Sequence, residues 1–434
     1  MTFAILAVAV LLSAIAWSLF IQWRMQRRKL DESEREVVDA ISRHIKLLSA
    51  VAAMLVMKGS MVLAAVMMLS ACTKDGDTIY QPDSDEPKAS TAPLVTVIYN
   101  ADALGDRSYN DLIFAGVEKT AREHGLRTLQ MSPTSYEEGL AYLQTMFQTV
   151  SATKTDTVRR LYIVCAAGYD EYIRQNAHLF AENPNADLLY LETPDPLPEG
   201  CGSTIYLPYY GAMYEAGALM PALEREALVV GSNPEDQTVA GAIKGFNDGF
   251  TTEYYSLYDP EEYSDEEYSE EEIAEMYEKK ISTVYLADHA GEGYNVADTT
   301  LIKLLSLQIP GEPYIWGPVL IPVCGGSGTT LSYLMHVLEV NRFMGIDVDV
   351  LSDQSPMSCL KHIDRAVSLC IGQWLSPQGM PRHQVLGLTS GYTGVSLHFY
   401  IDIIEEEFNE KITDELRQQI HEDAIRKEEA YENN

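Results

Sequence analysis

The stretch GDRSYNDLIFAG, residues 105–116, places an acid, an aromatic ring and an amide close together: Asp106, Tyr109 and Asn110. A ring can stack on a planar ligand, an amide offers a donor and an acceptor, and a carboxylate accepts hydrogen bonds. These groups can bind a small molecule, and no activated nucleophile stands among them. Two structural roles compete with binding: Tyr109 packs beneath its own helix, or Asn110 is an N-cap that satisfies free helix amides.

Further polar clusters follow other apolar runs along the chain. They lie at 100–110, 168–170, 232–237, 288–295, 325–330 and 347–353. Each comes where a predicted strand ends, and ligands of parallel α/β sheets bind beyond the carboxyl ends of the strands. The sequence therefore predicts one ligand site built from several loops.

The elements that position these loops alternate from about residue 93 onward. LVTVIYN (94–100) has the composition of a strand, and NDLIFAGVEKTAREHG (110–125) has helical spacing with Gly125 as its C-cap. The cycle repeats through RRLYIVCAAG, ADLLYLETP, ALVVGSN and ISTVYLAD, each followed or preceded by a helical pattern. This alternation predicts an α/β fold with parallel sheets covered by helices on both faces.

The composition limits the function. The chain has 434 residues, 46% of them hydrophobic, which predicts globular domains rather than disorder. Its formal net charge of -33 disfavours a nucleic-acid partner, because a polyphosphate would be repelled.

Two apolar segments precede the α/β region. Residues 2–23, TFAILAVAVLLSAIAWSLFIQW, are long enough for a transmembrane helix and are followed by Arg24, Arg27, Arg28 and Lys29. Residues 57–72, MKGSMVLAAVMMLSAC, have the pattern of a signal peptide. Because a signal peptide does not normally follow a spanning helix, we hypothesise that translation begins at Met54 or Met57.

The end of the second segment, LSAC at 69–72, resembles a bacterial lipobox. The resemblance implies cleavage before Cys72 and acylation of its thiol and new amino terminus, so that acyl chains hold the protein on a membrane. The alternative is a buried cysteine at a helix end. We expect 1–71 to be leader and 72–91 to be a tether, since the residues after Cys72 are polar and Pro-rich.

The α/β region resembles the basic membrane protein family of solute-binding lipoproteins, which includes purine nucleoside receptors that serve ABC transporters. The opening stretch is similar to the family's GDKSFN signature. Further matches follow in order: EALVVGSN with GFNDGF, then PVCGGSGTT, then GIDVDV with CLKHIDRAV. The resemblance covers about 93–400.

The resemblance implies a type I periplasmic binding protein fold, in which two lobes close on a ligand. It implies a first lobe at 92–206 with about 353–378, and a second at 207–352 with about 379–434. The acidic run at 259–280 is then an insertion in the second lobe.

The family's nucleoside contacts can be carried onto this sequence. They imply that Tyr109 stacks on a purine, that Asn110 pairs with a base edge, and that Asp347 and Lys361 bind the ribose. Where the family has phenylalanine, Tyr109 adds a hydroxyl. The full set of implied ligand-binding residues is Asn100, Tyr109, Asn110, Tyr169, Asp170, Tyr294, Gly325, Gly326, Gly328, Asp347 and Lys361.

Several of these motifs have other interpretations. CGGSGTT lacks the lysine of a phosphate loop, and Ser327 lacks the closing glycine of a nucleophile elbow, which favours a tight strand-to-helix turn. The alternative for Asp347 and Asp349 is that they end a strand without binding anything, and the alternative for Lys361 is a solvated side chain.

No cofactor or metal is predicted. The acidic run lacks the ligand order of an EF-hand, the histidines form no HxH or HxxxH cluster, and the cysteines form no CxxC pair. No disulfide can be assigned from spacing.

The sequence thus predicts a non-enzymatic, lipid-anchored binding protein of the cell envelope, with its binding domain outside the cytoplasm. A purine nucleoside is the favoured ligand and an ABC permease the implied partner. Two alternatives stay open: a surface lipoprotein of this fold with another ligand and no transporter, and a nucleoside-processing enzyme.

Overall fold

The computed structural model describes residues 91–101, 103–165, 167–223, 226–252, 281–289, 291–308, 318–338, 342–350, 352, 354–398 and 412–433. The chain falls into two compact units, Met1–Gln81 and Pro82–Asn434, and all described residues belong to the second. The predicted transmembrane segment, signal peptide, Cys72, tether and acidic insertion lie outside the described residues. Within the described ranges, no helix is both long enough and apolar enough to cross a membrane.

The first lobe is built on a six-stranded sheet whose paired strands are all parallel, in the order β11-β5-β4-β3-β1-β2. Ile98 lies level with Met131 and Val164, so three neighbouring strands end at one edge. The strands are β1 (Leu94–Ile98), β2 (Arg127–Met131), β3 (Arg160–Val164), β4 (Ala186–Leu191), β5 (Ser203–Tyr206) and β11 (His383–Val385).

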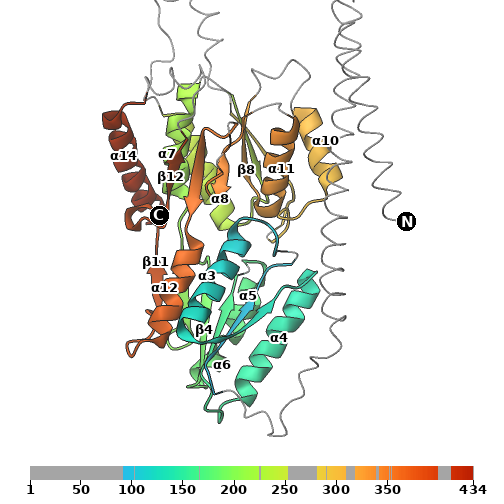
Figure 1. Cartoon of the computed structure of the whole chain (residues 1–434), viewed down its shortest axis with the longest axis vertical. Helices are drawn as coiled ribbons and strands as arrows, with labels where there is room; N and C mark the ends of the chain where they lie inside the picture. The colour runs from blue at the N-terminus through green and yellow to red at the C-terminus, as the bar shows by residue number, and fades with distance from the viewer. Residues whose placement is uncertain are drawn as a thin grey trace, which may run out of the picture. The chain divides into compact units, whose positions relative to one another are not determined.

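Helices cover both faces of this sheet, because its central strands are apolar on both sides. Val95 and Val97 of β1 pack in one core with the helices of one face, while Ile98 packs in a second core with those of the other. Gly125 ends the first of these helices at φ +65°, which confirms the predicted C-cap. The first face carries α3 (Tyr109–His124) and α12 (Ile363–Leu375), and the second carries α4 (Tyr136–Ala152), α5 (Asp170–Asn176) and α6 (His178–Ala181) (Figure 1).

The second lobe contains two three-stranded groups, β7-β6-β8 and β12-β10-β9. A parallel bridge from Leu320 to Phe343 joins them, so they lie side by side. All pairs are parallel except β10 with β12. The strands are β6 (Ala227–Gly231), β7 (Ile281–Tyr285), β8 (Val319–Val323), β9 (Gly345–Asp347), β10 (Met357–Lys361) and β12 (Thr393–Leu397).

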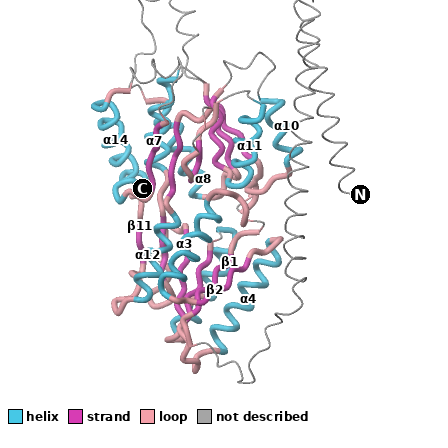
Figure 2. Tube along the Cα trace, viewed as in Figure 1, coloured by secondary structure: helices cyan, strands magenta, loops and turns pink. Residues whose placement is uncertain are grey.

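Helices also surround this sheet, as Figure 2 shows in cyan. One core joins the strands to α7 (Tyr210–Leu219), α8 (Gln237–Phe250) and α14 (Asp414–Glu432). Helix α11 (Gly325–Leu338) packs on β8, and α10 (Asp298–Gln308) packs on α11. Short 3-10 helices complete the lobes: η2 (Ala167–Tyr169), η3 (Met220–Leu223) and η4 (Leu388–Ser390). The predicted α/β class, with parallel sheets between helices, is confirmed.

The α7–α8 pair packs closely because glycines replace side chains at the contact. A Cβ on Gly245 would lie 2.2 Å from the Tyr210 carbonyl oxygen, and one on Gly249 would lie 2.1 Å from that of Tyr214. The two glycines of the GFNDGF motif therefore allow α8 to pack closely against α7.

Among the described elements, the chain crosses between the lobes three times: from β5 to α7, from β10 to α12 and from β11 to β12. The family resemblance implied that about 353–378 belong to the first lobe and about 379–434 to the second. Hydrogen bonding places β10 in the second sheet, where it pairs with β9, and β11 in the first, where it extends the edge beyond β5. The crossing therefore comes at the end of β10, and not ahead of it.

A buried carboxylate joins two of these crossings. Glu428 of α14 accepts hydrogen bonds from the backbone N–H of Gly211 at 3.0 Å and of Leu388 at 2.9 Å, and it is 6% exposed. A Cβ on Gly211 or Gly387 would lie within 2.5 Å of its carboxylate oxygens. The C-terminal helix is thus bonded to the start of α7 and to η4.

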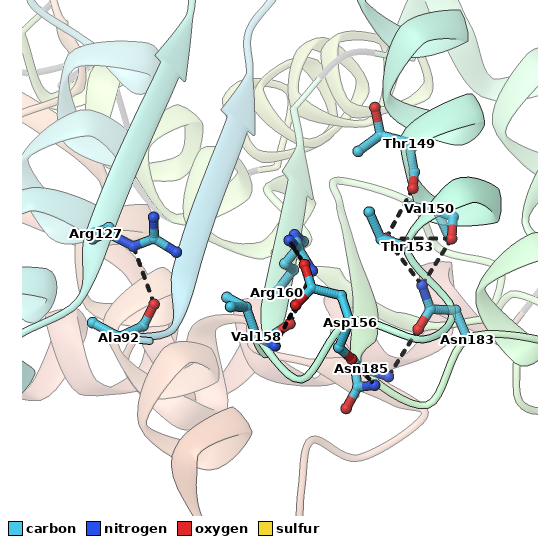
Figure 3. A network of polar contacts seen from close by, with 10 residues as sticks. All are labelled: Ala92, Arg127, Thr149, Val150, Thr153, Asp156, Val158, Arg160, Asn183 and Asn185. Atoms are coloured by element: carbon cyan, nitrogen blue, oxygen red, sulfur yellow. Dashed lines mark hydrogen bonds and ion pairs between the residues drawn. The ribbon is translucent and has the colours of Figure 1, made fainter. Parts of the chain in front are cut away.

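A polar network holds the amino ends of the first sheet (Figure 3). Asn183 donates to the Val150 carbonyl at 2.7 Å, Asn185 donates to the Asp156 carbonyl at 2.6 Å, and Arg160 pairs with Asp156. These groups satisfy one another and the adjoining backbone. The open polar groups of this lobe lie at the opposite, carboxyl end of the strands.

Candidate functional site

Both lobes contribute to a cavity of about 110 Å³ at the carboxyl ends of the strands. Hydrogen bonds join the lobes there: Ser108 Oγ donates to Asp347 Oδ2 at 2.7 Å, and Thr329 Oγ1 donates to the Asp106 carbonyl at 2.7 Å. Eight of the eleven residues carried over from the family line the cavity: Asn100, Tyr109, Asn110, Tyr294, Gly325, Gly326, Asp347 and Lys361.

Asp106 organises the loop that the sequence singled out. Its Oδ1 accepts from the N–H of Ser108 at 2.9 Å, and its Oδ2 accepts from the N–H and the Nδ2 of Asn110 at 3.0 and 2.9 Å. Ser108 occupies the N-cap position of α3, but its side chain makes no capping hydrogen bond, so Asp106 supplies the capping interactions. The N-cap role considered for Asn110 is therefore wrong.

Asn110 and Tyr109 keep open hydrogen-bonding atoms beside the cavity. Because Nδ2 of Asn110 donates to Asp106, its Oδ1 is the atom left over, and it is buried with no partner among the described residues. The Tyr109 hydroxyl is also buried, with no partner in the same ranges. Burial raises the pKa of Tyr109, and the nearby Glu192 adds to this, so the hydroxyl keeps its proton.

Asp347 ends β9 with φ +65°, a conformation that residues other than glycine rarely adopt. Its N–H donates to the Tyr209 hydroxyl at 3.1 Å, and that hydroxyl donates to the Cys359 carbonyl at 2.6 Å. Burial raises the pKa of Asp347, while Lys361 and the hydrogen bond from Ser108 oppose the rise. The strand end is thus fixed with its carboxylate at the cavity.

Lys361 is not a solvated lysine. Its side chain is 4% exposed, and its Nζ lies 3.0 Å from Glu192 Oε2, whose side chain is 12% exposed. The ammonium also lies 5.6 Å from the ring centre of Tyr109 and 5.0 Å from that of Tyr209. Burial raises the pKa of Glu192 despite the attraction of Lys361.

Tyr294 reaches the cavity from the second lobe, but its hydroxyl is already engaged. It donates to Asp236 Oδ2 at 2.6 Å, while Asp236 Oδ1 caps α8 by accepting from the N–H groups of Thr238 and Val239. Burial raises the pKa of Tyr294, and Asp236 adds to this.

CGGSGTT (324–330) follows directly on β8 and forms the start of α11, so the strand turns into the helix at Cys324 and Gly325. Gly325 has φ +53°, and a Cβ on Gly326 would lie 2.5 Å from Asn295 Oδ1. Gly328 packs against the end of β8, because a Cβ on it would lie 2.6 Å from the Pro322 carbonyl oxygen. Gly328 does not line this cavity. Ser327 Oγ accepts from the N–H of Val296 at 2.9 Å, which gives it a structural role.

Tyr169 and Asp170 also lie away from the cavity lining. The ring of Tyr169 stacks on Tyr136 at 5.0 Å, and its hydroxyl donates to the Tyr136 carbonyl at 3.3 Å. Asp170 forms an ion pair with Arg174 at 2.9 Å. Both side chains are occupied by neighbours on their own lobe.

Six lining residues with carboxylate, hydroxyl or amide side chains are outside the implied set of ligand-binding residues: Asp106, Glu192, Tyr209, Asp236, Thr238 and Asn295. Glu192 directly follows β4, so the rule that ligand groups follow strand ends could have found it. Tyr209 carried no such signal, because only the crossing brings it beside Asp347.

The cavity lining bears four carboxylates, Asp106, Glu192, Asp236 and Asp347, against one ammonium, Lys361. The described residues contain no group of side chains that could hold a metal ion. The thiols of Cys165 and Cys324 line the cavity, and burial raises the pKa of both, which disfavours a reactive thiolate.

Comparisons with known proteins locate the fold. No family model matches the sequence, and no curated protein matches it. A solved structure described as ABC transporter system solute-binding proteins from Aeropyrum pernix K1 is 16% identical, with 79% of this chain and 90% of that chain covered and a TM-score of 0.50.

A second solved structure, a transcriptional activator of the comK gene from Bacillus halodurans, is 12% identical. It matches over 76% of this chain and 96% of that chain, also with a TM-score of 0.50. These likenesses show a two-lobed α/β fold of the type I periplasmic binding protein kind. The resemblance to the nucleoside-binding family rests on the sequence motifs alone.

Proposed function

We propose that this chain is a solute-binding protein that captures a purine nucleoside between its lobes and delivers it to an ABC permease. The observation that carries the proposal is the arrangement across the cavity. Tyr109 and Asn110 of the first lobe present a ring and open polar atoms, while Asp347 lies on the second lobe.

Each group matches part of a nucleoside. The Tyr109 ring can stack on the base, a contact worth about 1–3 kcal/mol. The Asn110 carbonyl can accept from a base N–H, Asp347 can accept from ribose hydroxyls, and Lys361 has ammonium protons beyond the one given to Glu192. None of these roles breaks a bond in the ligand, so we propose no catalysis.

Lobe closure follows from the cross-lobe contacts. A ligand that touches both lobes binds the closed state more tightly and so increases its population. The cavity in this structure is bordered by the bonds between Ser108 and Asp347 and between Thr329 and Asp106. We propose that these bonds form when the ligand is enclosed.

The anchor belongs to the same proposal. Acylation of Cys72 would hold the binding lobes at a membrane, in reach of a permease. Replacing Cys72 with serine should move the protein from the membrane fraction of its host to the soluble fraction. Retention of C72S in the membrane fraction would contradict the anchor while leaving the ligand proposal untouched.

A thermal-shift panel tests the ligand. Adenosine, guanosine and inosine are each added to the purified full-length protein, and saturation at 100 times the dissociation constant should add about 2.7 kcal/mol to the free energy of unfolding. The shift should be lost in Tyr109→Ala and kept in Tyr136→Ala, which removes an exposed ring outside the cavity. No shift with any of the three removes the nucleoside from the proposal.

A further inference from the structure

Glu192 is held in the cavity at a conformational cost. It directly follows β4 and has φ +58°, in the left-handed region that a glutamate rarely adopts. Residues held in such conformations occur where the surrounding structure over-determines them, often at ligand sites. The strained backbone aims a carboxylate at the cavity, beside Lys361.

Only one of its two oxygens has a partner. Oε2 accepts from Lys361 at 3.0 Å, whereas Oε1 is buried and has no hydrogen-bond partner among the described residues. A buried acceptor without a donor is unfavourable, and a ligand that supplies the donor removes that penalty.

Two other buried cavity atoms share this property, Asn110 Oδ1 and the Tyr109 hydroxyl. The carbonyl and the carboxylate can only accept, while the hydroxyl can donate or accept. A complementary ligand therefore carries at least two N–H or O–H donors. It carries no anionic group, because the four lining carboxylates outnumber Lys361.

We infer that Glu192 is a specificity-determining residue, which accepts a hydrogen bond from the ligand through Oε1 and helps to exclude anionic ligands. This inference rests on the proposed function and adds the class of ligand: an uncharged or cationic, donor-rich molecule, such as a nucleoside and not its phosphate. A purely structural role for Glu192 would consist of anchoring Lys361 through Oε2.

The test is a titration-calorimetry series on the full-length protein with adenosine and four relatives: N6,N6-dimethyladenosine, 2′-deoxyadenosine, 3′-deoxyadenosine and adenosine 5′-monophosphate. The first three each remove donors, and the last adds negative charge. The proteins are wild type, Glu192→Gln, Glu192→Asp and the control Glu182→Gln, whose carboxylate pairs with Lys154 on the surface.

We expect Glu192→Gln to weaken adenosine binding by about 10- to 100-fold, the range of a hydrogen bond to a charged group. One of the three donor-deleted analogues should bind wild type more weakly than adenosine does. Because that analogue lacks the donor that Glu192 binds, its affinity for Glu192→Gln should equal its affinity for wild type. The monophosphate should bind wild type at least about tenfold more weakly than adenosine. Glu192→Asp keeps the charge and should keep that discrimination, whereas Glu182→Gln should behave as wild type.

Two results overturn the inference while the proposed function stands. One is unchanged adenosine binding by Glu192→Gln. The other is an equal loss for adenosine and every analogue, which is the signature of a role confined to anchoring Lys361. If none of the nucleosides binds wild type, the proposed function fails and this inference fails with it.

Discussion

Glu428 should make the free energy of unfolding fall as pH rises, and a substitution that cannot titrate should remove this contribution. Burial, with help from Glu432 and Glu429 on the same helix, raises the pKa of Glu428 from 4.5 to about 7, although the N–H groups of Leu388 and Gly211 favour its ionised form. Glu432 in turn accepts from the Tyr206 hydroxyl at 3.4 Å. The substitution to test is Glu428→Gln.

The sign follows from proton binding. Because the pKa in the folded state is above the ordinary value of 4.5, the folded protein holds this proton more tightly than the unfolded chain does. Below pH 4.5 the group is protonated in both states and adds no pH dependence. The free energy of unfolding then falls as pH rises from 4.5 to about 7. Above about pH 7 the group is ionised in both states, and its contribution to stability is fully lost.

The magnitude comes from the same shift. One pKa unit corresponds to about 1.4 kcal/mol, so a rise from 4.5 to about 7 corresponds to a loss of about 3 kcal/mol. Glutamine does not titrate, but its NH₂ cannot accept from the second backbone N–H, which costs about 1–3 kcal/mol at every pH. Glu428→Gln should therefore be less stable than wild type at pH 4 and equal or more stable at pH 8.

The assay is urea unfolding of the full-length protein at half-unit steps from pH 4 to pH 8. At each pH, the free energy of unfolding of wild type is subtracted from that of Glu428→Gln. This difference removes the contribution of every other titrating group. The difference in the free energy of unfolding should rise by about 3 kcal/mol across the series. Glu422→Gln, an exposed position on the same helix, should give a difference that stays flat. A flat difference for Glu428→Gln as well would refute the reasoning.

Three further outcomes are expected. Gly245→Ala should destabilise the fold by about 1–3 kcal/mol in urea unfolding, because the new methyl group meets the Tyr210 carbonyl, and an unchanged midpoint would contradict the close helix contact. Asn183→Ala should lower the free energy of unfolding by about 1–3 kcal/mol, because it removes the buried amide that donates to the Val150 carbonyl. The measurement is thermal unfolding of Asn183→Ala, compared with that of Asn185→Ala. Tyr109→Phe should raise the melting temperature of the unliganded protein, because it removes a buried hydroxyl without a partner, and a lower melting temperature would show that the hydroxyl is satisfied.

The sequence alone determined the class of fold and the region of the site. Strand and helix periods are local properties, so the runs that became β1, α3 and β6 were readable without any tertiary information, as was the glycine that ends α3. The rule that polar residues at strand ends meet at one edge pointed to the loops that hold Tyr109, Asn110 and Asp347, and the family resemblance singled out these residues, which do share a cavity.

Tertiary structure decided which strand belongs to which lobe and which polar side chains remain open. The sheet assignment of β10 and β11 depends on pairing with strands far away in the sequence, which no local period encodes. Tyr169 and Asp170 have the residue types of a binding site, but Tyr136 and Arg174 already occupy them. Glu192 resembles any other acid after a strand until folding buries it against Lys361 and leaves one oxygen unpaired, because a hydrogen-bond partner is a property of three-dimensional neighbours.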